Sequence, residues 1–192
     1  MRRVILAGIF FLWGSGCVTS WDDSVAIHHR PEDDKEYFEA YLKATRDDKV
    51  FVNFETRYTM SITYLSPDFR QAFAKRFESL FGSPQPFLDD ASSKLGFFIS
   101  VFSPDDDKHD LKDEQLWHTK MMIGETVYRP TLIKRLSKKE RWRPFFSNVH
   151  NWSYEYLVLF DTPTIALSAN TLKERSITLS LSNSDARIAQ TW

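Results

Sequence analysis

Cysteine is nearly absent from this chain of 192 residues, because Cys17 is its single example. One cysteine cannot form an internal disulfide, and it cannot supply the paired ligands of a structural zinc site. The five histidines form no His-Glu-x-x-His pattern, so the signature of a zinc hydrolase is missing as well. Each histidine is therefore interpreted as a structural residue rather than a metal ligand: His28, His29, His109, His118 and His150.

Glycine is also scarce, with six in the whole chain. Three of them precede Cys17, so the rest of the chain holds only Gly82, Gly96 and Gly124. Dinucleotide-binding folds and P-loops need several glycines close together, because the backbone must approach a phosphate. The scarcity of glycine therefore excludes both kinds of nucleotide site. A net charge of −1 likewise gives no support for nucleic acid as a partner.

The N-terminal segment combines two arginines with a short apolar run. Arg2 and Arg3 precede the apolar stretch 4–13, and small residues follow it at 14–16. This order is typical of a secretory signal, and the stretch is too short for a permanent membrane-spanning helix. The segment Gly14-Ser15-Gly16-Cys17 resembles the lipobox of bacterial lipoproteins, with Gly14 at the place where leucine is usual.

That resemblance covers residues 1–18 only and concerns processing rather than fold. It implies that a signal peptide, 1–16, is removed and that Cys17 carries a covalent lipid. Valine rather than aspartate at position 18 implies delivery to the outer membrane, without fixing the face on which the domain lies. Several acyl chains on one residue give stable anchoring, so the membrane is the expected partner through this lipid. No other cofactor is expected.

The remainder of the chain is predicted to be a polar tether, 17–30, followed by one domain, 31–192. Two helices are expected early in that domain. Pro31 and the acidic residues after it favour a helix over about 31–46. Ser66 and the following proline form a capping start for a second helix over 66–82, which Gly82 ends.

Strands are predicted for most of the rest. Residues 50–64 alternate between apolar and polar side chains, which predicts one long strand with a bend or bulge midway. Further strands are expected at 95–102, 116–123, 126–136, 154–160, 164–168, 176–181 and 187–192, with 95–102 central in its sheet. The predicted fold class is mainly β (α+β): an antiparallel β-sandwich with two early helices.

An acidic loop supplies the densest set of candidate metal ligands. Asp105, Asp107 and Asp110 are the candidate calcium ligands, since carboxylates that alternate in a loop suit Ca²⁺. The EF-hand pattern also needs a turn glycine, which this stretch lacks. The sequence therefore favours a solvated acidic turn, and calcium binding is the less favoured alternative.

A run rich in cations follows, opposed only by Glu140. Positive charge beside a tryptophan suits contact with anionic headgroups or with an acidic polymer of the envelope. The residues proposed for this contact are Lys134, Arg135, Lys138, Lys139, Arg141, Trp142 and Arg143. The alternative, which the sequence favours, is a solvated loop with its tryptophan folded into the domain.

No catalytic residue is assigned. After Cys17 there is no Gly-x-Ser-x-Gly motif and no second thiol, and catalytic triads or carboxylate pairs are defined by geometry. The predicted function is a lipid-anchored binding or structural module of the outer membrane with an unknown ligand. The alternatives are an envelope hydrolase acting on a glycan or lipid, and an accessory subunit of an envelope assembly with a protein partner.

Overall fold

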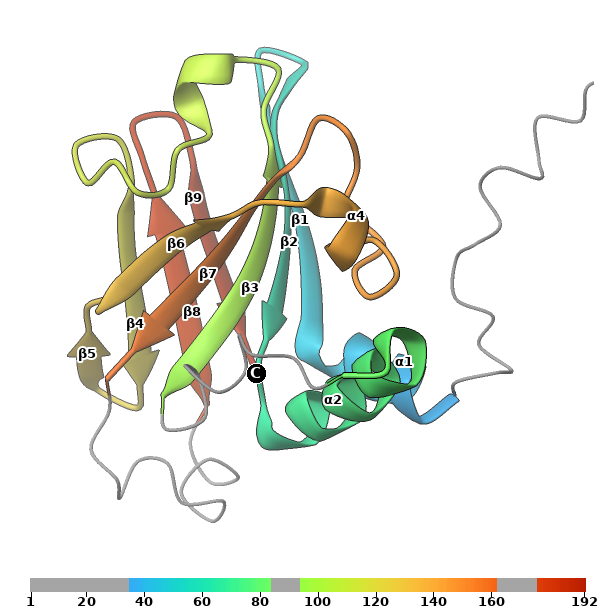
Figure 1. Cartoon of the computed structure of the whole chain (residues 1–192). Coiled ribbons are helices and arrows are strands. Elements are labelled where there is room, and N and C mark those ends of the chain that lie inside the picture. Colours follow the sequence, from blue (N-terminus) through green and yellow to red (C-terminus); the bar gives the residue numbers. More distant parts are fainter. Residues whose placement is uncertain (1–34, 84–93, 162–175) are drawn as a thin grey trace, which may run out of the picture.

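The computed structural model describes residues 35–83, 94–161 and 176–192 (Figure 1). The predicted signal, Cys17, the tether, the start of the first helix and the strand predicted at 164–168 lie outside the described residues. The elements are α1 (Lys35–Ala44), β1 (Thr45–Val52), β2 (Glu55–Tyr64), α2 (Pro67–Phe81), β3 (Leu95–Phe102), the 3-10 turn η1 (Asp106–Lys108), β4 (His118–Ile123), β5 (Thr126–Tyr128), β6 (Leu132–Leu136), α4 (Lys139–Trp142), β7 (Tyr154–Phe160), β8 (Ile177–Ser182) and β9 (Arg187–Thr191).

The strands form two antiparallel sheets, which confirms the predicted β-sandwich with two early helices. Five strands follow the order β1-β2-β3-β7-β6, and four follow the order β5-β4-β8-β9. The helices lie beside the five-stranded sheet (Figure 1). Strand β3 is central in its sheet, as its uninterrupted apolar sequence predicts.

Two hydrophobic cores hold these layers together. The first lies between the sheets and takes alternate residues of each strand, such as Met60 and Ile62 of β2. The second lies between the other face of the five-stranded sheet and the helices, where Phe73 of α2 contacts Phe145. Strands β3 and β7 contribute to both cores, so nearly all their residues are buried. This explains why neither strand alternates in sequence.

The predicted boundaries of α2 are confirmed by its caps. The Ser66 hydroxyl oxygen accepts a hydrogen bond from the Phe69 amide at 3.2 Å. Gly82 has a φ of 66°, and its amide donates to the Glu78 carbonyl at 2.7 Å. Helix α1 instead ends at Ala44 rather than at 46, because Thr45 begins β1 and pairs with Thr63.

The single long strand predicted over 50–64 is wrong, because this stretch is a hairpin. Asn53 and Phe54, with φ of 52° and 66°, form a two-residue turn between β1 and β2. A register shift at Val50 and Phe51 brings Val50 opposite Tyr58. From Val50 back to Thr45, residues of the same parity therefore lie opposite each other on the two strands. The alternation in the sequence for this reason does not reveal the hairpin.

The single strand predicted over 126–136 is also wrong, since it divides between the two sheets. Strand β5 pairs with β4, whereas β6 pairs with β7. Pro130 lies between them and has no amide hydrogen to continue a ladder. The predicted turns at Gly124 and at 183–185 are both present, and the Asn183 side-chain oxygen accepts from the amides of Asp185 and Ala186.

Candidate functional site

The acidic loop is held together by its own contacts. The Nζ of Lys108 lies 2.6 Å from Oδ2 of Asp185 and 3.8 Å from Oδ2 of Asp105. The Asp105 carboxylate therefore already has a cation beside it. Asp110 accepts hydrogen bonds from the Tyr156 hydroxyl and the Lys112 amide, and Asp107 is exposed. Within the described residues, no group of three or more acidic, His or Cys side chains is placed to hold a metal ion. Asp105, Asp107 and Asp110 are therefore not brought together as a site.

The described histidines occupy three different places. His118 is exposed and lines a pocket of about 690 Å³ between the edges of the two sheets. His109 is buried and stacks on the Tyr154 ring at 3.5 Å. His150 packs against Phe102, and burial together with the Lys139 and Arg143 charges lowers its pKa. Burial is the largest cause of this shift, and Lys139 and Arg143 place positive charge near the turn that precedes β7.

The run of cations is built on a buried tryptophan. Trp142 is 5% exposed, packs against Phe98, and donates its indole N–H to the Ser137 carbonyl at 2.9 Å. The proposed surface contact of Trp142 is thus wrong, and the tryptophan folds into the second core. Phe145 and Phe146 follow it into that core and fix the loop against α1 and α2.

Six cations remain on the surface around this anchor and are here named the basic cluster: Lys134, Arg135, Lys138, Lys139, Arg141 and Arg143. Among the described residues, no ion pair within 4.0 Å involves any of the six. Two of them instead lie over the Tyr154 ring, with Arg135 at 4.3 Å and Lys139 at 5.2 Å from its centroid. An aromatic ring attracts a cation without neutralising its charge. The cluster therefore keeps its positive charge.

A pocket of about 420 Å³ opens among these cations. It is here named the β6–β7 pocket, and it is lined by Arg135, Leu136, Ser137, Lys138, Lys139, Tyr154 and Glu155. The pairing of β6 with β7 creates it, because Leu136 lies opposite Glu155 in the sheet. Residues nearly twenty positions apart in sequence thus form one site.

Glu155 is the unusual residue of this pocket. Its side chain is 1% exposed, and its Oε1 accepts a hydrogen bond from the Ser153 hydroxyl at 2.5 Å. Its Oε2 is buried and has no hydrogen-bond partner among the described residues. Burial raises the pKa of Glu155, while the Ser153 hydrogen bond and the Lys139 and Arg135 charges act to lower it. A buried acceptor thus lies beside several unpaired cations.

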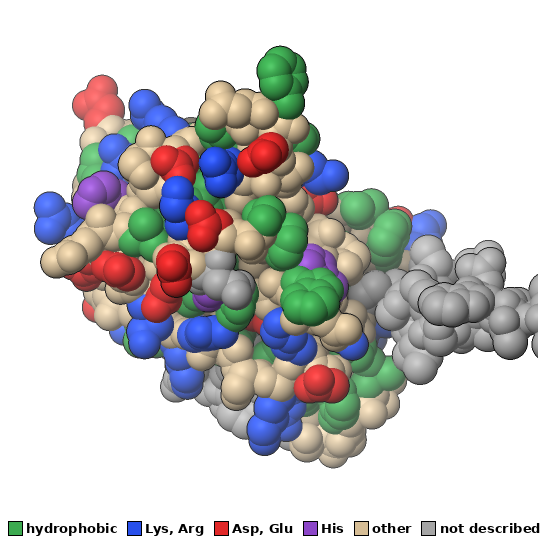
Figure 2. All heavy atoms as spheres, turned by 90° about the horizontal axis from the view of Figure 1, so that it is seen from above, with side chains coloured by type: hydrophobic (Ala, Val, Ile, Leu, Met, Phe, Trp, Pro, Cys, Tyr) green, Lys and Arg blue, Asp and Glu red, His purple; other side chains and the backbone are tan. Residues whose placement is uncertain are grey.

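The turn before β7 adds an exposed aromatic ring to this surface. Trp152 is 73% exposed, and its amide donates to Nδ1 of His150. Next to it, Asn151 accepts from both Arg143 and Lys139, which ties the turn to the basic cluster. Figure 2, which views the upper end of the sandwich, shows hydrophobic side chains standing among charged ones on this face.

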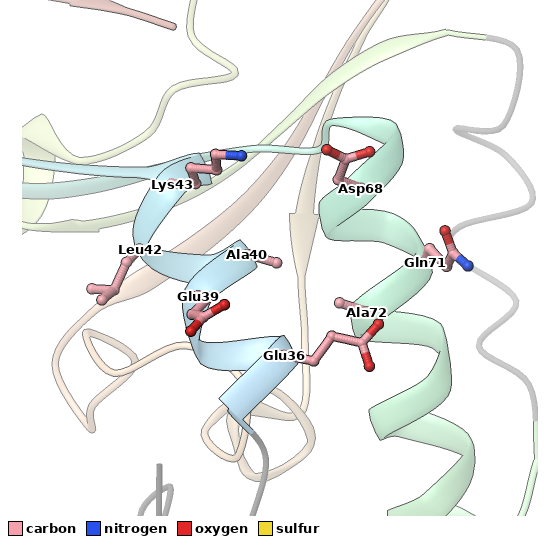
Figure 3. Close-up of a pocket in the computed structure, with 8 residues that line it drawn as sticks. All are labelled: Glu36, Glu39, Ala40, Leu42, Lys43, Asp68, Gln71 and Ala72. Atoms are coloured by element: carbon pink, nitrogen blue, oxygen red, sulfur yellow. The ribbon is translucent and has the colours of Figure 1, made fainter. Parts of the chain in front are cut away.

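A second hollow, the groove between α1 and α2, is less promising. Figure 3 shows Ala40 and Ala72 facing each other between the helices, with Glu36, Glu39 and Asp68 around them. Small side chains let two helices approach closely, which accounts for the alanines. Glu36 is already paired with Lys75 at 2.5 Å. The groove therefore has a structural explanation, whereas the β6–β7 pocket does not.

Sequence reasoning found the cations but missed Ser153, Tyr154 and Glu155. The one signal was a glutamate at the start of an apolar strand, where β7 reads Tyr-Glu-Tyr-Leu-Val-Leu-Phe. A charged residue within such a run is seldom buried unless it is paired. Without the β6–β7 pairing, nothing connected this glutamate with the cations.

No helix in the described parts of the chain combines the length and the apolar character needed to cross a membrane. Comparisons with protein-family models, with curated proteins and with solved structures found no match to this chain. The chemistry of its own residues is therefore the basis for any function.

Proposed function

We propose that this chain is a lipid-anchored envelope protein whose domain binds an anionic polymer through the basic cluster. The observation that carries the proposal is a set of six cations with no carboxylate ion-paired to any of them within the described residues. Unpaired positive charge attracts polyanions and speeds their association. The lipobox-like segment ending at Cys17 supports the placement in a bacterial envelope.

An anionic polymer suits this surface better than a membrane does. Trp142, the ring expected to enter the lipid interface, is buried in the second core. The cations also surround a pocket, and concave sites favour a group that enters them over a flat layer of headgroups. A binding role is likewise favoured over glycoside hydrolysis, which uses two carboxylates. Glu155 is the one carboxylate among the described residues that line the pocket.

Salt-dependent retention on immobilised polyglutamate tests the proposal, with the mature lipidated protein kept in neutral detergent. Replacing Lys134, Lys138 and Arg141 by glutamine removes three exposed charges of the cluster. We expect binding to be weaker by about threefold to about a hundredfold, since each charge contributes a few tenths to 1 kcal/mol. The matched control replaces Lys43, Lys112 and Lys120, which are exposed elsewhere and carry the same total charge.

Equal elution of the two triple variants would refute a role for the basic cluster. Doping the micelles with anionic phosphatidylglycerol tests the membrane alternative in the same experiment. Displacement of the protein from the resin by doped but not by neutral micelles would assign the cluster to headgroups instead.

The lipid anchor has a separate test. Mass spectrometry of the mature protein is expected to show an N-terminal Cys17 bearing acyl groups, with residues 1–16 removed. Full-length protein with an unmodified thiol would overturn the anchoring proposal. A Cys17→Ser variant is expected to remain uncut and unacylated.

A further inference from the structure

Oε2 of Glu155 has no hydrogen-bond partner among the described residues of the β6–β7 pocket. The binding of a polymer that carries anionic groups alone does not explain this oxygen. Strand pairing places this residue between Ser100 of β3 and Leu136 of β6, on the face that the helices cover. Its Oε1 is satisfied by Ser153, but its Oε2 has no donor within the part of the chain that the structure describes. Buried carboxylates normally have their oxygens hydrogen-bonded, because an unpaired buried acceptor is costly. A negative group also weakens the attraction of the pocket for an anion.

The missing partner has a definite chemistry. In its ionised form Glu155 accepts hydrogen bonds only, so a ligand group at Oε2 must then donate one. The cations of the cluster are donors and require an acceptor, preferably a charged one. The pocket therefore suits a ligand that carries an anionic group and a hydroxyl donor close together.

We propose that the β6–β7 pocket binds an acidic saccharide, with the sugar carboxylate on the basic cluster and a ring hydroxyl donating to Oε2 of Glu155. This inference rests on the proposed function and deepens it by naming the chemistry of the polymer. A uronic acid residue carries a carboxylate and free hydroxyl groups on the same sugar ring; in a 4-linked oligogalacturonate these hydroxyls are at C2 and C3. Polyglutamate has the carboxylates alone, so it satisfies the cations and leaves Oε2 without a donor.

Lys139 links the proposed contact of the sugar carboxylate with the proposed contact of the hydroxyl at Glu155. Its Nζ donates to the Asn151 carbonyl at 2.8 Å, lies over the Tyr154 ring, and acts electrostatically on Glu155. In the proposed complex this flexible side chain turns toward the sugar carboxylate. The charge of Lys139 then serves the ligand, and the hydroxyl takes over the stabilisation of Glu155. The anionic contact and the hydroxyl contact are therefore expected to form together.

The test compares two probes of equal carboxylate number, a short oligogalacturonate and a short polyglutamate, by calorimetry on the mature lipidated protein in neutral detergent. The wild-type protein is expected to bind the oligogalacturonate about tenfold more tightly, since one hydrogen bond to a charged group is involved. Glu155→Gln is expected to remove most of that preference while still binding polyglutamate. Glu125→Gln, at the exposed β4–β5 turn, is the matched control and keeps the preference.

A second measurement needs no variant. Oligogalacturonate with its hydroxyls acetylated keeps its carboxylates and loses its donors, so the wild-type protein is expected to bind it as weakly as polyglutamate. Equal affinity of the wild-type protein for all three probes refutes the saccharide inference and leaves polyanion binding intact. Failure to bind any probe overturns the proposed function itself. A preference that survives Glu155→Gln refutes the role of Oε2.

Discussion

Replacing Glu155 by glutamine is expected to stabilise the protein near neutral pH while weakening its proposed ligand binding. Glutamine has nearly the same shape, and its carbonyl oxygen can still accept from the Ser153 hydroxyl. The replacement removes a buried carboxylate whose second oxygen has no partner in the described ranges 35–83, 94–161 and 176–192. Leaving a buried polar group unpaired costs roughly 1–3 kcal/mol, and more when it is charged. Because the new amide is itself only partly satisfied, we expect a net gain near the lower limit, about 1 kcal/mol.

The stabilising effect of Glu155→Gln is expected to depend on pH. Burial raises the pKa of Glu155 in the folded protein above the ordinary value that it has in the unfolded chain. Between the two values the folded state binds the proton more tightly, so the wild-type free energy of unfolding falls as pH rises through that window. Below the ordinary carboxyl pKa the side chain is neutral in both states. The advantage of Glu155→Gln is therefore expected to be small in acid and complete above the raised pKa.

Thermal melting followed by near-ultraviolet circular dichroism measures this effect. For a domain of this size, 1 kcal/mol corresponds to a rise in Tm of about 2–4 °C. Glu125→Gln, at an exposed turn, is expected to leave Tm unchanged. A lower Tm for Glu155→Gln at neutral pH would refute the reasoning. It would show that Arg135 and Lys139 stabilise the carboxylate by more than its burial costs.

Three further changes test the fold. Phe54→Gly is expected to raise the free energy of unfolding by about 1 kcal/mol. The reason is that Phe54 is fully exposed at a φ of 66°, a conformation that is costly for any residue with a Cβ. A lower urea midpoint for the variant would contradict this. Phe145→Ala is expected to lower the free energy of unfolding by about 3–5 kcal/mol, since the fully buried ring contacts Phe73 and three other aromatic rings. A decrease of less than about 1 kcal/mol in urea unfolding would show that the second core is loosely packed. Asp185→Asn is expected to flatten the acid side of the pH–stability curve. The hydrogen bond from Lys108 lowers the pKa of Asp185, so its contribution is present above the ordinary Asp pKa and is lost as pH falls through the lowered one. If the wild type and Asp185→Asn lose stability in acid to the same extent, the hydrogen bond from Lys108 makes no such contribution.

The sequence by itself determined the elements whose signals are local. Ser66, Pro67 and Gly82 determine where α2 begins and ends, since a cap acts within one turn of the backbone. The apolar runs of β3 and β7 matched their strands residue for residue, because a strand buried on both faces leaves no place for alternation. The mainly β character follows from the same local patterns.

Tertiary structure decided everything that depends on which strand lies beside which. The alternation over 50–64 is the same for one strand and for a hairpin with a register shift, so only the pairing of Val50 with Tyr58 distinguishes them. The basic run was visible in the sequence, but the burial of Trp142 depends on Phe98 from a distant strand. The pairing of β7 with β6 brings Glu155 next to the cations, and this pairing cannot be read from the sequence. Hydrophobic periodicity reports which face of an element is buried, whereas the partner that buries it is set by packing between segments far apart in the chain.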